Sequence, residues 1–233
     1  MIERFEMIRV LGQIPHKVVI AVSGGADSMA ALSFAYNGGK RDLVALHFNH
    51  GSEHAQDAER LVRAYCKEND IPLVIGRISR EKRKEESQEE YWRNERYGFF
   101  SSYANKRHES MGIGREGLNE FFCSITTIIT AHHLGDSVEN WVFTSLHGRG
   151  RLIPHQRDNF LRPFLLTEKE DLVSWCERKN IPYIIDPSNS DSRYMRNYIR
   201  NELLPMAMIV NPGISKTVKK MVKSAYENCP NNL

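Results

Sequence analysis

Short apolar segments bounded by turn residues alternate along this chain with longer segments of mixed polarity. The short segments are rich in β-branched residues, which predicts buried strands. These strands are predicted at residues 18–22, 42–49, 71–79, 124–133 and 181–186. Helices are predicted at residues 27–36, 54–69, 91–104, 134–146, 167–180 and 214–227.

Strands that alternate with helices predict an α/β fold, a doubly wound parallel sheet with helices on both faces. Residues 1–205 are expected to form this domain and residues 206–233 a short helical C-terminal tail. An amphipathic helix is expected at residues 1–12, and residues 106–120 read as an irregular insertion. Thr167, with Glu170 three positions later, predicts a capping box at the start of a helix.

Composition places the chain among ordinary globular proteins, with 41% apolar and 26% charged residues. No apolar run approaches the length of a membrane span, and the first residues lack the apolar block of a signal peptide, so we expect a cytoplasmic protein without membrane association. The four cysteines are far apart and form no CxxC pair, which argues against a zinc or cluster site.

Charge is distributed unevenly over the 233 residues, whose net charge is +3. Residues 149–233 hold 14 basic and 9 acidic side chains, a net charge of +5, whereas residues 1–148 hold 18 and 20. A basic C-terminal third is a weak indication of nucleic-acid binding, because contacts from Lys and Arg to phosphate dominate such affinities.

The segment SGGADS, from Ser23 to Ser28, follows the first predicted strand and leads directly into a helix. Glycines let the backbone turn its N–H groups toward one point, and a helix N-terminus adds partial positive charge, so this segment predicts a phosphate-binding loop. It has neither the GxxxxGK[ST] pattern of a Walker loop nor the GxGxxG pattern of a dinucleotide site.

This loop resembles the PP-loop of the ATP pyrophosphatase superfamily, which implies the N-type, adenine nucleotide alpha hydrolase-like fold. The resemblance implies that Ser23, Gly24, Gly25, Ala26 and Ser28 hold the pyrophosphate of ATP. Asp27 cannot favourably face phosphate alone, and it makes sense as a ligand of Mg²⁺ shared with the phosphates. A helix N-cap is the alternative reading of Asp27.

Four further segments place polar residues after predicted strands: HFNHGSEHAQD, EEYWRNERYGFF, TAHHLGDSVEN and DPSNSDSRYMRNYIRNELLP. In this order, with HGRG and LRPFL between the last two, the chain from about residue 18 to residue 205 resembles the tRNA(Ile)-lysidine synthetases. The resemblance implies that ATP activates the C2 oxygen of the wobble cytidine in an isoleucine tRNA with a CAU anticodon. The ε-amine of free lysine then displaces AMP, and lysidine results.

The residues between the loop and the last motif suggest roles in this chemistry. Arg96, three positions after Arg93, is a candidate for neutralising charge at the α-phosphate. His50 is a candidate nucleotide contact, and His132 and His133 are candidate substrate contacts. A solvated helix face for the arginines, and hydrogen-bonded structural roles for the histidines, are the alternatives.

Asp136 and Glu139 lie three positions apart, so one helical turn brings both carboxylates to the same side. Two acids in one pocket need a cation, which the lysine ammonium supplies, and one carboxylate is a candidate acceptor for its proton. Arg196 and Arg200 share a helical face. The resemblance places that helix beside the substrate, with both arginines as substrate-binding residues and Arg196 a candidate for the lysine carboxylate or an RNA phosphate.

Two features depart from the family pattern. Bacterial members usually continue past LLP with helical domains that bind the tRNA body, and Gly135 stands where the family commonly has the first of two acids. Two alternatives to the synthetase therefore stay open: a PP-loop ligase that joins another amine or acts on another nucleic acid, and a catalytically weak module that binds ATP or RNA. The oligomeric state is also open, with a homodimer among the alternatives.

Overall fold

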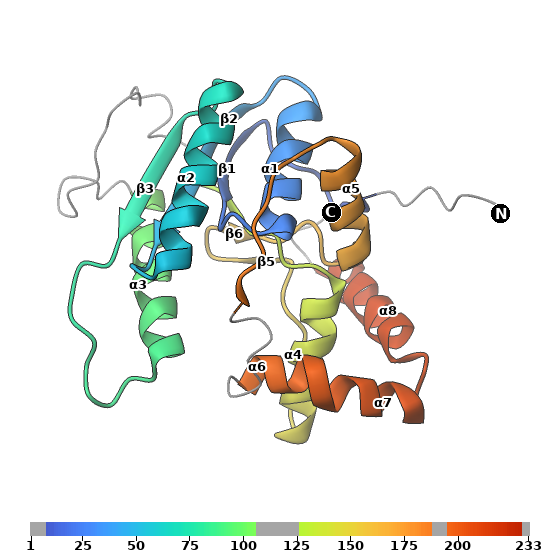
Figure 1. The fold of residues 1–233 in the computed structure, drawn as a ribbon. Coiled ribbons are helices and arrows are strands. Elements are labelled where there is room, and N and C mark those ends of the chain that lie inside the picture. Colours follow the sequence, from blue (N-terminus) through green and yellow to red (C-terminus); the bar gives the residue numbers. More distant parts are fainter. Residues whose placement is uncertain (1–7, 106–125, 188–194, 230–233) are drawn as a thin grey trace.

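Six strands form one sheet in the computed structural model, which describes residues 8–105, 126–187 and 195–229 (Figure 1). The strand order is β3-β2-β1-β4-β6-β5. The strands are β1 (Lys17–Ala21), β2 (Asp42–Asn49), β3 (Leu73–Arg77), β4 (Ile128–Ile129), β5 (Gln156–Arg157) and β6 (Phe160–Leu161). Neighbours from β3 to β6 pair in parallel, and only the edge pair β5–β6 is antiparallel. The predicted doubly wound α/β fold is confirmed.

Helices cover both faces of the sheet. They are α1 (Ala26–Asn37), α2 (Glu53–Glu68), α3 (Gln88–Ala104), α4 (Leu134–Leu146), α5 (Lys169–Arg178), α6 (Met195–Tyr198), α7 (Leu204–Val210) and α8 (Ile214–Glu227), with a π-helical segment η4 (Ile199–Leu203) between α6 and α7. Val18 and Ile20 of β1 pack with α1, α2 and α5, whereas Val19 packs with α3 on the opposite face. Because alternate residues of a strand point to opposite faces, one strand contributes to both cores.

A third apolar cluster lies beyond the carboxyl ends of the parallel strands, where α4, η4, α7 and α8 gather (Figure 1). Val138 and Val142 of α4 pack there with Val218 and Val222 of α8. Helix α8 therefore buries its apolar face against the body of the protein rather than extending into solvent.

The prediction of a fifth strand at residues 181–186 is wrong. Within the described residues this segment makes a single parallel bridge, from Ile184 to Gly25, and the sheet is continued instead by β6 and β5. Its apolar character has another cause, because Ile181 and Tyr183 pack on the core beside α1 and α5. The hairpin β5–β6 escaped prediction because its strands have two residues each.

Two local predictions at chain and helix ends also fail. Residues 1–7 lie outside the described residues, and Ile8–Gly12 are not helical. The N-cap of α5 is one residue later than predicted: it is Glu168, whose backbone N–H donates to Asp171 Oδ2 at 3.3 Å. Thr167 is fully buried and instead exchanges hydrogen bonds with the backbone of Arg9. The predicted insertion at 106–120 lies outside the described residues.

The strand order creates a switch point at the centre of the sheet. Strand β1 pairs with β2 on one side and β4 on the other, so the chain leaves β1 and β4 in opposite directions. Ligands of open α/β sheets bind beyond the carboxyl ends of the strands at such a point. The segments that follow β1 and β4, residues 22–25 and 130–133, both lie there.

Candidate active site

The loop after β1 is stabilised by its own serines. The backbone N–H of Ser23 donates to Ser28 Oγ at 3.0 Å, the Ser28 hydroxyl donates to the Gly25 carbonyl at 3.0 Å, and the Gly25 N–H donates to Ser23 Oγ at 3.4 Å. Met29 is the first residue of α1 whose backbone N–H donates along the helix, to the Gly25 carbonyl. The amides of the first turn of α1, from Ala26 to Ser28, therefore have no acceptor within the helix and are the donors that a phosphate needs.

Gly24 allows the loop to approach two neighbouring segments. Its φ of +91° is in the left-handed region, and a Cβ here would come within 3.1 Å of Ala58 Cβ on α2. On the other side, the N–H of Ile184 donates to the Gly24 carbonyl at 3.0 Å. The loop is thus held between α2 and residue 184, which the sequence alone did not indicate.

Asp27, in the first turn of α1, lines a cavity beyond the carboxyl ends of the strands. Burial raises the pKa of its carboxyl, and Oδ1 is buried without a hydrogen-bond partner. Among the described residues, no group of three His, Cys, Asp or Glu side chains is arranged to hold a metal ion. A single carboxylate that lacks a donor suits a Mg²⁺ ion whose remaining ligands are phosphate oxygens and water.

His133 lies between Asp27 and Asp136. Its Nε2 is 3.8 Å from Asp27 Oδ2 and 3.7 Å from Asp136 Oδ2, and the ring is buried. A side chain at position 135 would interfere with this arrangement, because a Cβ on Gly135 would lie 2.8 Å from His133 Cε1. Gly135 is therefore matched to the position of the imidazole between the two acids.

Asp136 and Glu139 lie together on α4, as predicted, and both are buried. Arg196 donates to Asp136 Oδ1 at 2.6 Å and to Glu139 Oε2 at 3.0 Å, and Arg200 donates to Glu139 Oε1 at 2.6 Å. The two acids therefore already have cationic partners within the protein. The prediction from the sequence was instead that the lysine ammonium supplies the cation. The sequence placed each pair on a common face, but not the two pairs against each other.

The charge of this cluster lowers the pKa of Asp136 to about 2. Burial alone would raise it, but His133, Arg196 and His132 and the N–H of His133, which donates to Oδ2 at 2.9 Å, stabilise the ionised form more strongly. Asp136 thus remains ionised at neutral pH and is a very weak base. Arg200 belongs to the π-helical segment η4, a type of local widening that is frequent at functional sites.

A cavity of about 470 Å³ joins these groups. Its lining includes Ser23, Gly25, Asp27, Ser28, His50, Arg96, His132, Asp136, Arg196 and Arg200. The predicted site residues thus converge on one cavity from five segments distant in the sequence. Gly24, Ala26, His133 and Glu139 do not line the cavity themselves; Gly24 and His133 lie next to lining residues, and Glu139 binds Arg196 and Arg200.

The remaining histidines of the site are held in their neutral forms. Burial lowers the pKa of His132 to about 4, and its Nδ1 is 2.8 Å from Thr130 Oγ1. Burial also lowers the pKa of His50, whose ring stacks on Trp92 with centroids 4.3 Å apart. His47, not singled out from the sequence, contacts the Val22 carbonyl through Nδ1 at 2.9 Å and supports the loop from below.

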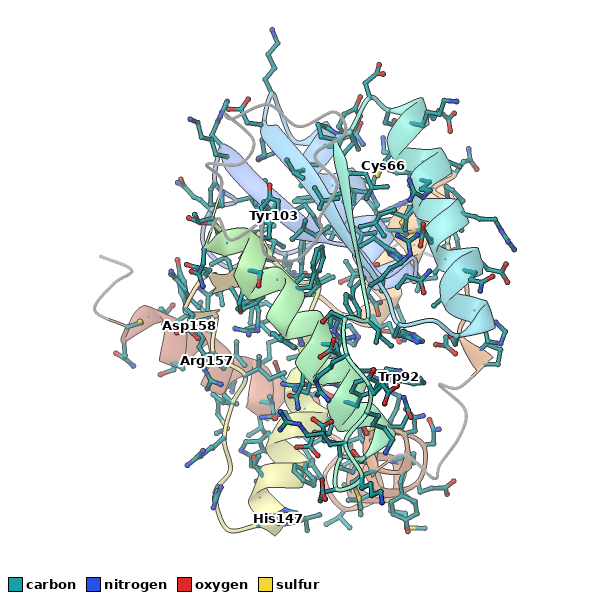
Figure 2. The ribbon with its side chains drawn as sticks, turned by 90° about the vertical axis from the view of Figure 1, so that its left-hand side faces the viewer. Cys66, Trp92, Tyr103, His147, Arg157 and Asp158 are labelled. Atoms are coloured by element: carbon teal, nitrogen blue, oxygen red, sulfur yellow. The ribbon has the colours of Figure 1, made fainter. Side chains whose placement is uncertain are left out.

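Several lining residues were missed by sequence reasoning. Trp92, near the start of α3 (Figure 2), and Tyr97, one turn further along this helix, give the cavity aromatic surface. Arg93 and Arg96 lie over the Tyr97 ring, with guanidinium carbons 5.0 and 5.8 Å from its centroid. The spacing of the aromatic residues in EEYWRNERYGFF was the sequence signal that could have identified these lining residues.

Comparison with known proteins identifies the family. A family model described as a PP-loop domain matches residues 4–114 and 118–207. The tRNA(Ile)-lysidine synthase of Staphylococcus aureus (strain MRSA252) is 31% identical over 81% of this chain and 43% of its own length. The enzyme of the same name from Thermotoga sp. (strain RQ2) is 29% identical over 90% of this chain and 49% of its own length. The predicted resemblance to this group is confirmed.

The bifunctional protein TilS/HprT of Listeria innocua is 29% identical over 97% of this chain, but this covers only 34% of that protein. The chain thus spans between a third and a half of the length of the curated relatives that it matches. The U34-tRNA thiolase NcsA of Methanococcus maripaludis shares the fold, with a TM-score of 0.66 and 13% identity over 94% of this chain and 75% of its own. Over the part of the chain that the structure describes, no helix has the length and apolar character needed to cross a membrane. With the family model covering most of its length, the chain belongs to the PP-loop domain family.

Proposed function

We propose that this chain is an ATP-dependent carbon–nitrogen ligase of the tRNA(Ile)-lysidine synthetase type. Its substrates are ATP with Mg²⁺, free L-lysine and an isoleucine tRNA with a CAU anticodon, and its products are lysidine in that tRNA, AMP and pyrophosphate. The relatives with this name support the proposal. Residues 1–205 act as the catalytic domain and residues 206–233 as its C-terminal tail.

One observation carries the proposal. A single cavity is lined by the loop at the start of α1, by Asp27, whose Oδ1 has no hydrogen-bond partner, and by Asp136, Arg196 and Arg200 of the acid–arginine cluster. A nucleotidase would need only the first two features. The acid–arginine cluster provides a place where an amine or another charged co-substrate reaches an activated intermediate.

In the first step the C2 oxygen of cytidine attacks the α-phosphorus of ATP, the bond to the β-phosphate oxygen breaks, and pyrophosphate leaves. The amides at the start of α1 and the serine hydroxyls bind the departing pyrophosphate. Arg96, at the cavity wall, neutralises charge on the α-phosphate. Asp27 would hold Mg²⁺, which when bound neutralises the phosphate charge and orients the chain of phosphates.

In the second step a neutral amine attacks C2 of the adenylated base, and the bond from C2 to the oxygen of AMP breaks. Before it loses its proton the amine is an ammonium ion, which Asp136 binds electrostatically; with a pKa of about 2, the Asp136 carboxylate is too weak a base to take that proton at neutral pH. Glu139 is the carboxylate that accepts this proton. The amine reaches both acids only when Arg196 or Arg200 moves from them, which assigns to these arginines the substrate carboxylate or the AMP phosphate as alternative partners.

The test is a product analysis with purified protein, Mg-ATP, bulk tRNA and a mixture of amino acids. We expect AMP and pyrophosphate in amounts equal to the modified tRNA, and mass spectrometry of digested tRNA should show cytidine that has gained lysine and lost water. ADP and phosphate as products, or an adduct of different mass, would contradict the proposal.

A ligase that uses another amine is the second candidate. It rests on Gly135, which stands where the family commonly has an acid, and on the arginines that already pair with Asp136 and Glu139, whereas the relatives named above do not favour it. The same product analysis separates the two candidates, because the added mass identifies the amine. A module that only binds ATP or RNA would release no AMP.

A further inference from the structure

A second cavity, of about 550 Å³, adjoins the candidate active site. It lies between α3, α4, α6 and residues 151–157. Four residues line both cavities, namely Arg93, Tyr97, His132 and Arg196. A ligand in the second cavity would therefore meet the nucleotide cavity across this shared wall. Figure 2 shows the two sides: Trp92 marks one side of α3 and Arg157 the other.

The lining of the second cavity is strongly basic. Its charged residues are Arg93, Arg151, Arg157, Arg162 and Arg196 against Glu89 and Glu139. Because Glu139 is already paired with Arg196 and Arg200, the other arginines face the cavity with little compensation. An anionic ligand is the chemical complement of this wall.

Arg162 gives the strongest indication. It is 93% buried, since its exposed fraction is 7%, and it donates to the Pro154 carbonyl at 3.1 Å. Burial, together with Arg157 and Arg93, lowers the pKa of its guanidinium despite a favourable contact with Tyr97. Within the described residues no carboxylate forms an ion pair with it. A buried cation without a counter-charge is unfavourable, and a phosphate in the cavity would relieve this.

Two further arginines stand at the rim. Residue 151 is fixed to α4, because Asn140 Nδ2 donates to the Arg151 carbonyl at 2.7 Å and the Arg151 N–H donates to Thr144 Oγ1 at 2.7 Å. Arg157 belongs to the hairpin β5–β6 and is exposed. Both arginines are exposed and line the cavity, so they are available to the phosphates of a bound ligand.

The cavity also has apolar surface of the kind on which bases stack. Phe143 of α4 is 38% exposed and Met195 of α6 is 60% exposed, and both line the cavity. Tyr97 adds an aromatic ring that already lies beneath Arg93. Aromatic surface interleaved with arginines is typical of sites for single-stranded nucleic acid.

We propose that this second cavity binds the single-stranded RNA segment that flanks the reacting base, with Arg151 and Arg157 on its phosphates and Arg162 as the buried counter-charge. This inference rests on the proposed function, which requires an RNA base to enter the nucleotide cavity. It adds residues outside the phosphate loop and the acid cluster, and it assigns a role to three arginines of the basic segment 149–233.

The test compares Arg151→Gln, Arg157→Gln and the double variant with Arg149→Gln. Arg149 is exposed and belongs to the same basic segment but does not line the cavity. In tRNA-dependent AMP release, each cavity variant should raise the KM for tRNA about tenfold with the KM for ATP unchanged. The slope of log affinity against log salt concentration should fall by about 0.7 for each arginine–phosphate interaction that a substitution removes. Arg149→Gln should change neither quantity.

An equal effect of Arg149→Gln would overturn the inference, because it would show a diffuse basic surface. Unchanged tRNA parameters in the double variant would overturn it as well. Failure of the proposed function is distinguishable: if no tRNA supports AMP release, binding of a fluorescent single-stranded RNA of anticodon-loop length still compares the same variants. Free AMP and an unlabelled oligonucleotide are then compared as competitors of that RNA. If AMP competes as strongly as the oligonucleotide, the cavity is a mononucleotide site and the RNA assignment is refuted.

Discussion

The hydrogen bonds within the phosphate loop join residues at most 5 positions apart, whereas the acid–arginine cluster joins residues 57 to 61 positions apart. The internal hydrogen bonds of the loop can therefore form as soon as β1 and α1 form, although its anchor to Ile184 comes later. The cluster exists only when α4 and the segment α6–η4 have packed together. Substitutions in the loop should act mainly on chemistry, and substitutions in the cluster on chemistry and stability together.

Asp27→Ala is expected to have the largest effect on activity. It removes the acid that suits Mg²⁺, so AMP and pyrophosphate formation should fall by about 10²–10³-fold, as for the loss of one preorganised electrostatic group. The melting temperature should stay close to that of the wild type, because Asp27 Oδ1 has no hydrogen-bond partner to lose. Asp57→Ala, on the exposed side of α2, is the matched control.

Glu139→Gln should separate the two regions. Amine transfer should slow by about 10²-fold while adenylate formation is retained, as measured by single-turnover assays with and without lysine. The variant should also unfold more easily, by about 1–3 kcal/mol, because Arg196 and Arg200 lose the ionised partner that they share, and their partial exposure moderates this loss. Equal loss of both chemical steps would contradict the division of roles.

Two groups at the cluster end of the site, His132 and Asp136, should make the stability of the protein depend on pH. His132 has a pKa lowered to about 4 from 6.5, so its neutral form stabilises the folded state, and this contribution is lost as pH falls from about 6.5 through 4. Asp136, lowered to about 2 from 3.8, loses its contribution only as pH falls from about 4 through 2. Urea unfolding should show a decrease on the order of 1–3 kcal/mol between pH 7 and pH 4 that His132→Asn reduces.

Gly135→Ala should give the smallest effect. Alanine favours a helix by up to about 1 kcal/mol over glycine, but its Cβ requires the buried His133 ring to shift. We expect a change in unfolding free energy within about 1 kcal/mol, with amine transfer altered more than adenylate formation. Gly98→Ala, on α3 with open space around its Cβ position, is the control for helix propensity alone.

The sequence predicted most elements because local patterns determine them. Helices 134–146 and 214–227 and strand 42–49 were predicted to the residue, each having a continuous pattern and clear end signals. The segment 181–186 has the same apolar character as a strand, and only its position over the phosphate loop distinguishes it. Such a position depends on how the whole chain folds, and the spacing of apolar residues carries no information about that.

The candidate site was likewise predictable only where its residues form short local motifs. Ser23–Ser28 and the spacing of Asp136 and Glu139 are visible as short motifs. The bonds from Arg196 and Arg200 to those acids are not, because they connect motifs whose relative placement no local rule provides. Arg162 escaped notice for a related reason: an arginine in a short apolar segment gives no sign that it is buried without a carboxylate.

The hydrogen bond from Ile184 to Gly24 has a consequence for how the protein matures. It closes a chain segment of 160 residues, and β1 must also wait for β4, more than 100 residues later, to complete the centre of the sheet. Such long-range closures are slow and come late in folding. During synthesis the nascent chain would carry the phosphate-loop sequence from early on, yet this loop would gain its second anchor only after residue 184 had left the ribosome. The candidate site is therefore complete only once residue 184 is free to fold, and a chain truncated before that residue would lack the anchor from Ile184 to Gly24.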